Sequence, residues 1–306
     1  MRETWIAAVC LVVLASYSIF YCAAESKQCP GNVASLRFRL VNHYHIIVAV
    51  SINHSGPYNF LLDTGTQITM IDPALAAELH LETQGEASVA GLGSHRAASF
   101  ALLEHLQVGS NDVARLKVLV YGLHDRHFGD LNIRGILGED FLEHFDMLID
   151  NKHGLLCLDD TASMSGAVKG TRIALVTPAN AADVDALPRL LIVEGRLSDG
   201  MRPVRLMLDS GTNTPFLYNA PQYMSLPLIR TTFLRGSGVD GTPRIFSPLP
   251  PQEVKIGSLE LSNVLFFTVV RAKQSSHTAE FDGLLTMGLF HRVFIDHADH
   301  FAVLEP

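Results

Sequence analysis

The sequence predicts an all-β protein of two lobes that are related by an internal repeat, with a few short helices. The main sign is a stretch that occurs twice, first as Leu62-Asp63-Thr64-Gly65-Thr66 and then as Leu208-Asp209-Ser210-Gly211-Thr212. The offset, 209 − 63 = 146, also separates Leu148-Ile149-Asp150 from Phe294-Ile295-Asp296. Most segments between turns are short and rich in β-branched residues, as strands are. The 306 residues also exceed the usual size of one domain, about 100–200 residues.

Composition supplies two hydrophobic cores and excludes one class of partner. Hydrophobic residues make up 48% of the chain and charged residues 18%, which is typical of a folded protein. The net charge is −8, the pI is near 5.9, and no run of basic residues occurs. Nucleic acid is therefore excluded as a partner.

The first 24 residues have the pattern of an export signal. Arg2 precedes an apolar stretch from Trp5 to Tyr21, and Cys22-Ala23-Ala24 offers small residues for cleavage. We therefore expect a periplasmic or secreted protein, attached to a membrane only if this segment stays uncleaved. The first lobe is then expected at 25–160 and the second at 161–306, in a monomer.

Two cysteines remain in the mature chain, Cys29 and Cys157. In an oxidising compartment they can form one disulfide that ties the start of the mature chain to the end of the first lobe. They can equally be two unrelated thiols, and the sequence leaves both alternatives open.

The first half predicts a hairpin that presents Asp63, because strands at 46–52 and 58–62 flank turn residues. A strand at 68–71 and a short helix follow, the helix capped by Asp72 with Pro73 in its first turn. The remaining expected segments are a glycine turn at 91–93, strands at 101–106 and 113–120, a short helix at 139–145, a hairpin at 148–158 and a linker at 159–170.

The second half repeats this order, with strands at 190–193 and 204–208 that end on Asp209. Glycines at 236–241 occupy the place of the earlier glycine turn, a strand is expected at 283–285, and the segment 294–304 closes the lobe. The stretch 236–241 also matches a dinucleotide fingerprint. We set a nucleotide cofactor aside because Pro243 follows where a helix should begin.

Two copies of one acidic turn predict a particular chemistry. A lone Asp-Thr-Gly usually caps its own turn. If two such turns meet at a pseudo-twofold axis, Asp63 and Asp209 come into contact, and two touching carboxyls resist ionising together. They then share one proton, which provides a base and an acid in the same site. A water between them can be deprotonated by one while the other protonates a substrate carbonyl.

The neighbouring residues fit this task. Gly65 and Gly211 let the backbone turn sharply beside the carboxyls. We expect the hydroxyls of Thr66 and Thr212 to bond the outer carboxyl oxygens, and Thr64 and Ser210 to bond across the lobe interface. The histidines at 124, 127, 297 and 300 lie outside any helical metal motif, so we expect solvated loops and no metal site.

At these residues the chain resembles the aspartic peptidases, and the bacterial retropepsin-like group in particular. Besides the two acidic turns, the resemblance rests on Ile136-Leu137-Gly138 and the residues around it. It implies two acid-protease-type closed β-barrel lobes, peptide hydrolysis of a peptide or unfolded protein, and no metal or cofactor. It implies the following roles: catalytic dyad Asp63 and Asp209; flap tips Gly91-Leu92-Gly93 and Gly236-Ser237-Gly238; packing against the catalytic turns by Ile136-Leu137-Gly138 and by Leu284-Leu285.

The second lobe departs from the pattern at one place, where Thr286 follows Leu284-Leu285 and the first lobe has Gly138. Looser packing behind Asp209 is the expected consequence. A catalytically inactive, peptide-binding envelope protein on the same scaffold is therefore the alternative function.

Overall fold

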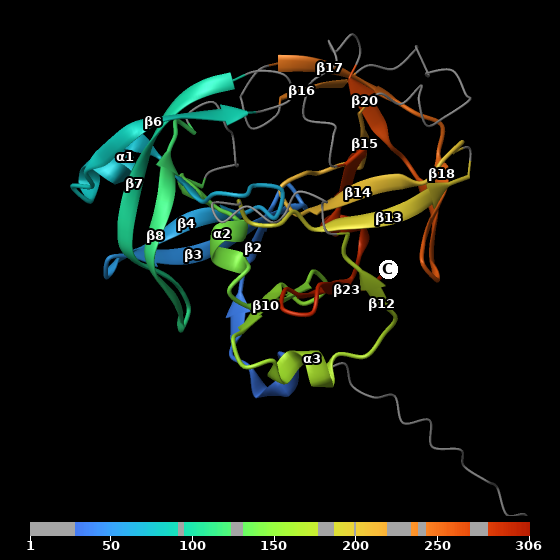
Figure 1. Cartoon of the computed structure of the whole chain (residues 1–306), viewed down its shortest axis with the longest axis horizontal. Coiled ribbons are helices and arrows are strands. Elements are labelled where there is room, and N and C mark those ends of the chain that lie inside the picture. The colour runs from blue at the N-terminus through green and yellow to red at the C-terminus, as the bar shows by residue number, and fades with distance from the viewer. Residues whose placement is uncertain are drawn as a thin grey trace, which may run out of the picture.

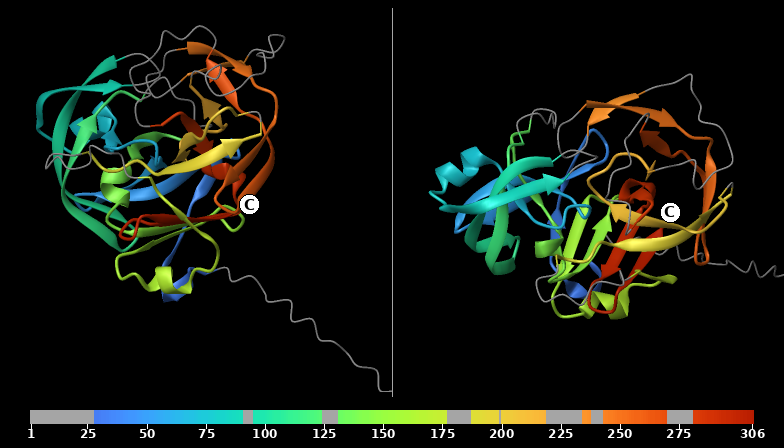
Figure 2. Two further views of the ribbon diagram at one scale, coloured as in Figure 1. Left: turned by 45° about the vertical axis from the view of Figure 1, so that its right-hand side comes forward. Right: turned by 45° about the horizontal axis from the view of Figure 1, so that its top comes forward.

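The computed structural model describes residues 28–90, 95–123, 131–176, 187–198, 200–218, 234–237, 243–269 and 281–306. Two lobes lie side by side above a third sheet, with the first lobe at the left of Figure 1 and the second at the right. Figure 2 gives two further views of the same arrangement. The predicted all-β, two-lobed fold is confirmed.

The first lobe is an eight-stranded sheet that curls on itself. Its strand order is β2-β3-β4-β9-β5-β8-β7-β6, and β7 also returns to pair with β3. Its strands are β2 (Arg39–Val41), β3 (His45–Ile52), β4 (Ser55–Leu62), β5 (Met70–Ile71), β6 (Thr83–Ala90), β7 (His95–Val108), β8 (Asn111–Val120) and β9 (Ile133–Leu137). Its helices are α1 (Pro73–Glu78) and α2 (Glu139–Leu142).

The second lobe is a nine-stranded sheet in the order β16-β17-β20-β15-β21-β14-β13-β18-β19. Its strands are β13 (Ile192–Leu197), β14 (Val204–Asp209), β15 (Phe216–Leu217), β16 (Leu234–Ser237), β17 (Pro243–Pro248), β18 (Gln252–Ile256), β19 (Leu259–Val264), β20 (Phe267–Val269) and β21 (Gly283–Thr286). Pro250 and Pro251 separate β17 from β18, because proline has no N–H to donate to a strand ladder. A 3₁₀ turn, η4 (Met287–Leu289), follows β21.

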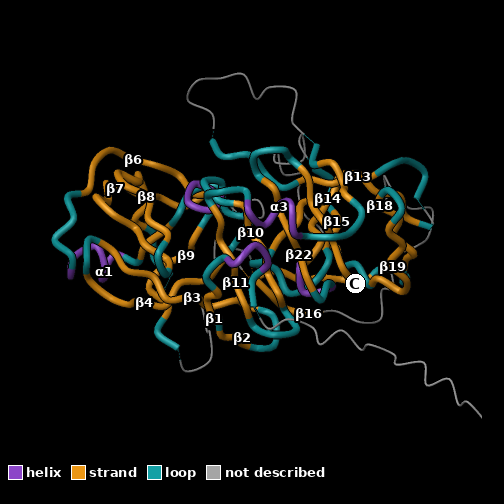
Figure 3. Tube along the Cα trace, turned by 90° about the horizontal axis from the view of Figure 1, so that it is seen from below, coloured by secondary structure: helices purple, strands orange, loops and turns teal. Residues whose placement is uncertain are grey.

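A six-stranded sheet below the lobes takes strands from both halves of the chain. Its order is β1-β11-β10-β22-β23-β12, and the central pair β10–β22 joins residues 147–150 to residues 292–295. Its strands are β1 (Ser35–Arg37), β10 (Asp146–Asp150), β11 (Leu155–Asp159), β12 (Arg172–Ala174), β22 (Arg292–Asp296) and β23 (Phe301–Glu305). Seen from below in Figure 3, β10, β11 and β22 lie in the middle, between the strands of the two lobes.

In each lobe the strand before the acidic turn forms the same kind of parallel pair. In the first lobe β4 pairs in parallel with β9, which brings Leu62 opposite Leu137. In the second lobe β14 pairs in parallel with β21, which brings Leu208 opposite Leu285. In each lobe the strand before the acidic turn therefore lies beside a strand from much later in the chain.

Several predicted elements differ in extent. The helix expected at 139–145 ends at Leu142, and the stretch expected as a linker holds helix α3 (Ser163–Ala167). Asp159 anchors that segment because its carboxylate accepts a hydrogen bond of 2.7 Å from the N–H of Met164, whose side chain is fully buried. The sequence analysis did not predict this helix because a five-residue segment that contains serine and glycine has little helical preference of its own.

The core is formed by leucine, isoleucine, valine and phenylalanine from both lobes and from the six-stranded sheet. A few exposed apolar side chains are scattered over the surface. No helix within the described part of the chain has the length and hydropathy needed to cross a membrane.

Candidate active site

The two predicted acids lie at the ends of β4 and β14, where the parallel strand pairs end. Asp63 is 8% exposed and Asp209 is 7% exposed, so water reaches little of either side chain. The N–H of Asp63 donates to Leu137 O at 3.0 Å, which ties the first acid to the strand β9 beside it. Packing of the sheets therefore determines where both carboxyls lie.

Four hydrogen bonds join the two acidic turns across the lobe interface. The hydroxyl of Thr64 donates to Leu208 O at 2.9 Å and accepts from the N–H of Ser210 at 3.0 Å. In return, the hydroxyl of Ser210 donates to Leu62 O at 2.9 Å and accepts from the N–H of Thr64 at 3.1 Å. All four bonds are buried, so the turns are held in register by a reciprocal brace that the sequence predicted.

The two carboxyls lie across the turns from one another. A Cβ placed on Gly65 would lie 2.8 Å from the Cγ of Asp209, and one placed on Gly211 would lie 2.4 Å from the Cγ of Asp63. Each carboxyl therefore packs directly on the glycine of the opposite turn. These glycines are needed for close approach, because any side chain would occupy the space of a carboxyl.

Asp63 is held by donors to both of its oxygens. The N–H of Gly65 donates to Oδ1 at 3.0 Å, and the hydroxyl of Thr66 donates to Oδ2 at 2.9 Å. The Thr66 hydroxyl bond agrees with the expectation from the sequence. Two donors that favour the charged carboxylate make Asp63 suited to act as a base.

Asp209 is held differently. The N–H groups of Gly211 and Thr212 donate to its Oδ1 at 2.7 and 3.1 Å. The expected bond from the Thr212 hydroxyl is wrong, because that hydroxyl donates to Thr214 O at 3.2 Å. The backbone of the turn satisfies Asp209, which leaves the threonine side chain free to close a local turn.

Burial and the neighbouring acid change the protonation of Asp209. Burial, followed by the charge of Asp63 and a hydrogen bond between the two carboxyls, holds the pKa of Asp209 well above its ordinary value. The N–H groups of Gly211 and Thr212 oppose this shift without cancelling it. The two carboxyls therefore resist ionising together, and the pair retains a proton more readily than an isolated aspartate does.

The segment behind Asp63 is tightly packed. A Cβ on Gly138 would lie 2.7 Å from Thr66 O, and the hydroxyl of Thr69 accepts from the N–H of Gly138 at 3.0 Å. That hydroxyl in turn donates to Asp140 at 2.6 Å. Burial raises the pKa of Asp140 to about 6 although both bonds from Thr69 oppose it.

The segment behind Asp209 pairs in the same register as the segment behind Asp63. Leu284 and Leu285 pair in parallel with Met207 and Leu208, as Ile136 and Leu137 pair with Leu61 and Leu62. Thr286 takes the place of Gly138, and its hydroxyl donates to Thr212 O at 2.7 Å. A side-chain bond therefore replaces the close backbone contact that glycine permits.

The predicted flap tips lie largely outside the described residues. Gly91-Leu92-Gly93 and Gly238 are not described, whereas Gly236 and Ser237 end strand β16. The hairpins that carry these tips, β6–β7 and β16–β17, lie at the top of the two lobes in Figure 1. β17 begins at Pro243, which agrees with setting the nucleotide fingerprint aside.

Three residues near the acids were missed by the sequence analysis. Tyr218 follows Asp209 by nine residues, and burial together with the charge of Asp209 raises its pKa. Glu139 and His297 form a largely buried contact behind Asp63. The expectation that His297 lies in a solvated loop is wrong, since its side chain is 9% exposed. The offset of 146 relates Tyr218 to Asp72 and His297 to Asn151, and neither pair shares a residue type, so the repeat gave no sign of these contacts.

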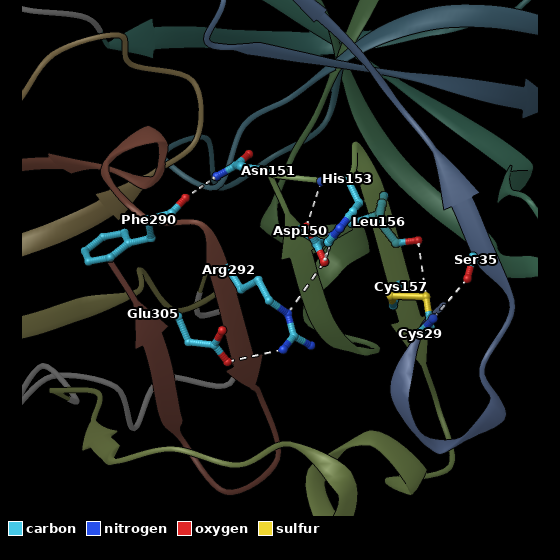
Figure 4. Close-up of polar contacts among 10 residues, drawn as sticks. All are labelled: Cys29, Ser35, Asp150, Asn151, His153, Leu156, Cys157, Phe290, Arg292 and Glu305. Atoms are coloured by element: carbon cyan, nitrogen blue, oxygen red, sulfur yellow. Dashed lines mark hydrogen bonds and ion pairs between the residues drawn. A yellow bond between two sulfur atoms is a disulfide. The ribbon is translucent and has the colours of Figure 1, made fainter. Parts of the chain in front are cut away.

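The two mature cysteines are joined. Cys29 and Cys157 form a disulfide that connects the segment before β1 to β11 in the six-stranded sheet (Figure 4). The same figure shows Asn151 reaching from β10 to Phe290 of the second lobe, and Asp150 between His153 and Arg292. Polar side chains thus tie the halves together below the acidic turns.

Among the residues that the structure describes, no cluster of three or more histidine, cysteine or acidic side chains is arranged to hold a metal ion. The histidines at 124 and 127 lie outside these residues.

Comparison with known proteins bears on the family and on the fold. Residues 48–141 match the family model for aspartyl proteases. The crystal structure of an aspartic proteinase from Irpex lacteus superposes with a TM-score of 0.53 at 13% identity, over 89% of this chain and 97% of that one. A retropepsin-like aspartic protease from Rickettsia conorii is 21% identical over 42% of this chain and 91% of its own, with a TM-score of 0.31. No curated protein sequence matches significantly. Residues 48–141 therefore match the aspartyl protease family, and the chain as a whole is similar in fold to the two-lobed aspartic proteinase from Irpex lacteus.

Proposed function

We propose that the chain is an aspartic endopeptidase that hydrolyses peptide bonds with a water activated between Asp63 and Asp209. One observation carries the proposal: the reciprocal bonds between Thr64 and Ser210 hold two buried acidic turns face to face. Two carboxyls at such a junction serve as a base and an acid in one site.

The different surroundings of the acids assign their roles. Asp63, with a hydroxyl and an amide donor, takes the proton of the water as its oxygen attacks the peptide carbonyl. Asp209, whose pKa is raised by burial and by Asp63, gives its proton to the carbonyl oxygen. In the resulting tetrahedral diol, Asp63 gives the proton it took from water to the nitrogen of the leaving amine, while Asp209 takes a proton back from one of the two hydroxyls. The C–N bond breaks, the carboxylic acid and amine products form, and the dyad again holds one proton.

The test is the isosteric Asp63→Asn. The amide preserves the shape of the side chain but does not accept the proton of water, so we expect cleavage of an unfolded, reduced protein to be lost at acidic to neutral pH. Asp160→Asn, at an exposed position outside the site, is the matched control and should cleave as the wild type does. Cleavage by Asp63→Asn at the rate of the control would remove the dyad from the mechanism.

The second candidate function is a catalytically inactive peptide-binding protein. It is favoured by the Thr212 hydroxyl, which donates to Thr214 O and not to Asp209, whereas the Thr66 hydroxyl donates to Asp63. A peptide mimetic with a hydroxyl in place of the scissile carbonyl separates the two functions. An endopeptidase binds it much more weakly after substitution of either acid, whereas a binding protein holds it and its amide parent equally.

We also propose that the protein is exported, acts as a monomer and takes a peptide or unfolded protein as substrate. The Cys29–Cys157 disulfide supports export, because structural disulfides persist in oxidising compartments. Both acids lie on one chain, which supports a monomer. Recovery of the full chain in the cytosol, with both thiols reduced, would contradict the proposed export.

A further inference from the structure

A buried acid–base pair made by both halves of the chain lies behind the Asp63 turn. Glu139, the first residue of α2, has no exposed side-chain surface, and His297, in the turn between β22 and β23, is 9% exposed. The Nε2 of His297 lies 3.1 Å from Oε2 of Glu139. Burying a carboxylate costs free energy unless it is paired, and the contact with His297 lowers this cost for Glu139.

The contact of the second ring nitrogen of His297, Nδ1, shows which atoms of the pair carry protons. Nδ1 is 2.6 Å from Phe145 O, and a carbonyl oxygen only accepts, so Nδ1 carries a hydrogen. The contact between Nε2 and the Glu139 carboxylate is then a hydrogen bond only if a further proton lies between these atoms. The pair therefore holds one proton more than a neutral imidazole beside a carboxylate.

The charges around the pair favour keeping that proton. Burial alone lowers the pKa of His297, but Glu139, the Phe145 carbonyl and Asp146 outweigh it and hold the pKa above its ordinary value. Burial also raises the pKa of Glu139, and His297 opposes this shift. The other charged groups that face the pair are Glu143 and Asp63 near Glu139, His300 near His297, and Asp296 and Asp159 behind Asp146.

A short chain of bonds joins the pair to the dyad. The N–H of Glu139 donates to Thr66 O at 2.9 Å, and the hydroxyl of Thr66 donates to Oδ2 of Asp63 at 2.9 Å. Gly138, directly before Glu139, packs under the same Thr66 carbonyl. Any shift of the start of α2 therefore moves the threonine that supports Asp63.

In the second lobe, residues without ionisable side chains stand at the positions that correspond to Glu139 and His297. Since Leu137 and Leu285 hold matching registers, Glu139 corresponds to Met287, which is 1% exposed. The offset of 146 matches His297 with Asn151, whose amide donates to Met287 O at 3.1 Å and to Phe290 O at 2.9 Å (Figure 4). An apolar side chain and a neutral amide thus suffice to brace a lobe, so packing alone does not explain the ionisable pair beside Asp63.

We propose that Glu139 and His297 are positioning residues for Asp63, holding the Thr66 peptide and hydroxyl against its carboxyl for as long as the pair keeps its shared proton. The inference rests on the proposed function of the dyad. When the proton leaves at higher pH, a buried, uncompensated carboxylate remains beside Asp63 and the start of α2 shifts. Cleavage is then lost on the alkaline side.

The experiment compares pH profiles of kcat/KM for His297→Asn, for the double variant Glu139→Met with His297→Asn, and for Glu260→Gln as control. Glu260 pairs with Lys255 on the surface, so its variant should follow the wild type at every pH. His297→Asn leaves Glu139 buried without a counter-charge. It should cleave normally near pH 4 and lose about tenfold or more near pH 7, because the proton that His297 shares with Glu139 in the wild type is then missing. The double variant copies the brace of the second lobe and should return to within about threefold of the wild type at both pH values.

Two outcomes overturn the inference: a loss in His297→Asn that is the same at every pH, or a double variant no better than the single one. Both would mark the pair as purely structural. If the wild type and Asp63→Asn are equally inert, the proposed function fails, and NMR titration of the Asp209 carboxyl decides the inference instead. A titration that moves in His297→Asn but stays in place in Glu260→Gln supports positioning, and an unmoved one overturns it.

Discussion

Gly211→Ala tests whether the two turns hold their carboxyls as closely as the structure has them. A Cβ on Gly211 would lie 2.4 Å from the Cγ of Asp63, whereas ordinary contact begins at 3.4 Å, so the carboxyl must move by 3.4 − 2.4 = 1.0 Å. Gly211 is not among the residues with positive φ, so alanine does not strain the backbone. Because a displacement of about 1 Å at a reacting group costs about 100-fold, we expect kcat/KM to fall by about that factor.

Stability should change much less than activity. The atom that gives way is the end of the Asp63 side chain, which relieves the overlap by rotating, so the loss should stay near the low end of overpacking costs, about 1 kcal/mol. Gly166→Ala is the control, because no heavy atom lies within 4 Å of its added Cβ in helix α3. The measurements are kcat/KM on one peptide and unfolding in urea. Activity of Gly211→Ala within about fivefold of Gly166→Ala would refute the packing of Asp63 on this turn.

Two further predictions concern the brace and the lower sheet. Thr64→Val removes the hydroxyl that bonds the N–H of Ser210 and Leu208 O, at about 1–3 kcal/mol for each group, so the free energy of unfolding in urea should fall by about 2–6 kcal/mol. In the control Thr212→Val, which removes a local bond, the free energy of unfolding should fall by less than about 1 kcal/mol. Equal losses in the two variants would rule out the brace. Asp146→Asn concerns a carboxyl whose pKa is raised to about 6 by burial and then by Asp296. Its folded pKa exceeds its unfolded one, so its stabilising effect is present below pH 4 and is lost as pH rises through about 6. The variant should therefore raise the melting temperature at pH 8 and leave it unchanged at pH 4, and a shift of the same size at both would contradict this assignment.

The repeat in the sequence was sufficient to predict the fold and to bring the two acids together. An offset that relates Asp63 to Asp209 and also Asp150 to Asp296 covers both the acidic turns and the strands of the lower sheet. Local chemistry was sufficient for the turns themselves, since Thr64 and Ser210 have one hydroxyl each and one opposite turn to bond. For Thr64 and Ser210 the repeat and the local hydrogen-bonding capacity agreed, and the structure has the expected bonds.

Contacts between distant, unrepeated residues were not predictable. Glu139 and His297 are 158 residues apart, and at the corresponding positions stand Met287 and Asn151, so the repeat itself gives no sign of a pair. The Thr212 hydroxyl was also misassigned, because the amides of its own turn already satisfy Asp209 and the hydroxyl closes a shorter loop to Thr214. Both errors have one cause. The partner of each polar group depends on distances in the folded structure, and the sequence alone does not give these distances.

The differences between the lobes bear on how one carboxyl becomes the acid and the other the base. Two identical turns give both acids the same surroundings, and only the bound substrate then distinguishes them. Here Asp63 accepts from a threonine hydroxyl in the turn that Glu139 contacts, whereas Asp209 accepts from the amides of its own turn and shares a hydrogen bond with Asp63. A hydroxyl donor favours the charged form of Asp63, and burial beside that charge favours the protonated form of Asp209. A single chain with two unequal lobes can therefore fix the roles of its acids before any peptide arrives.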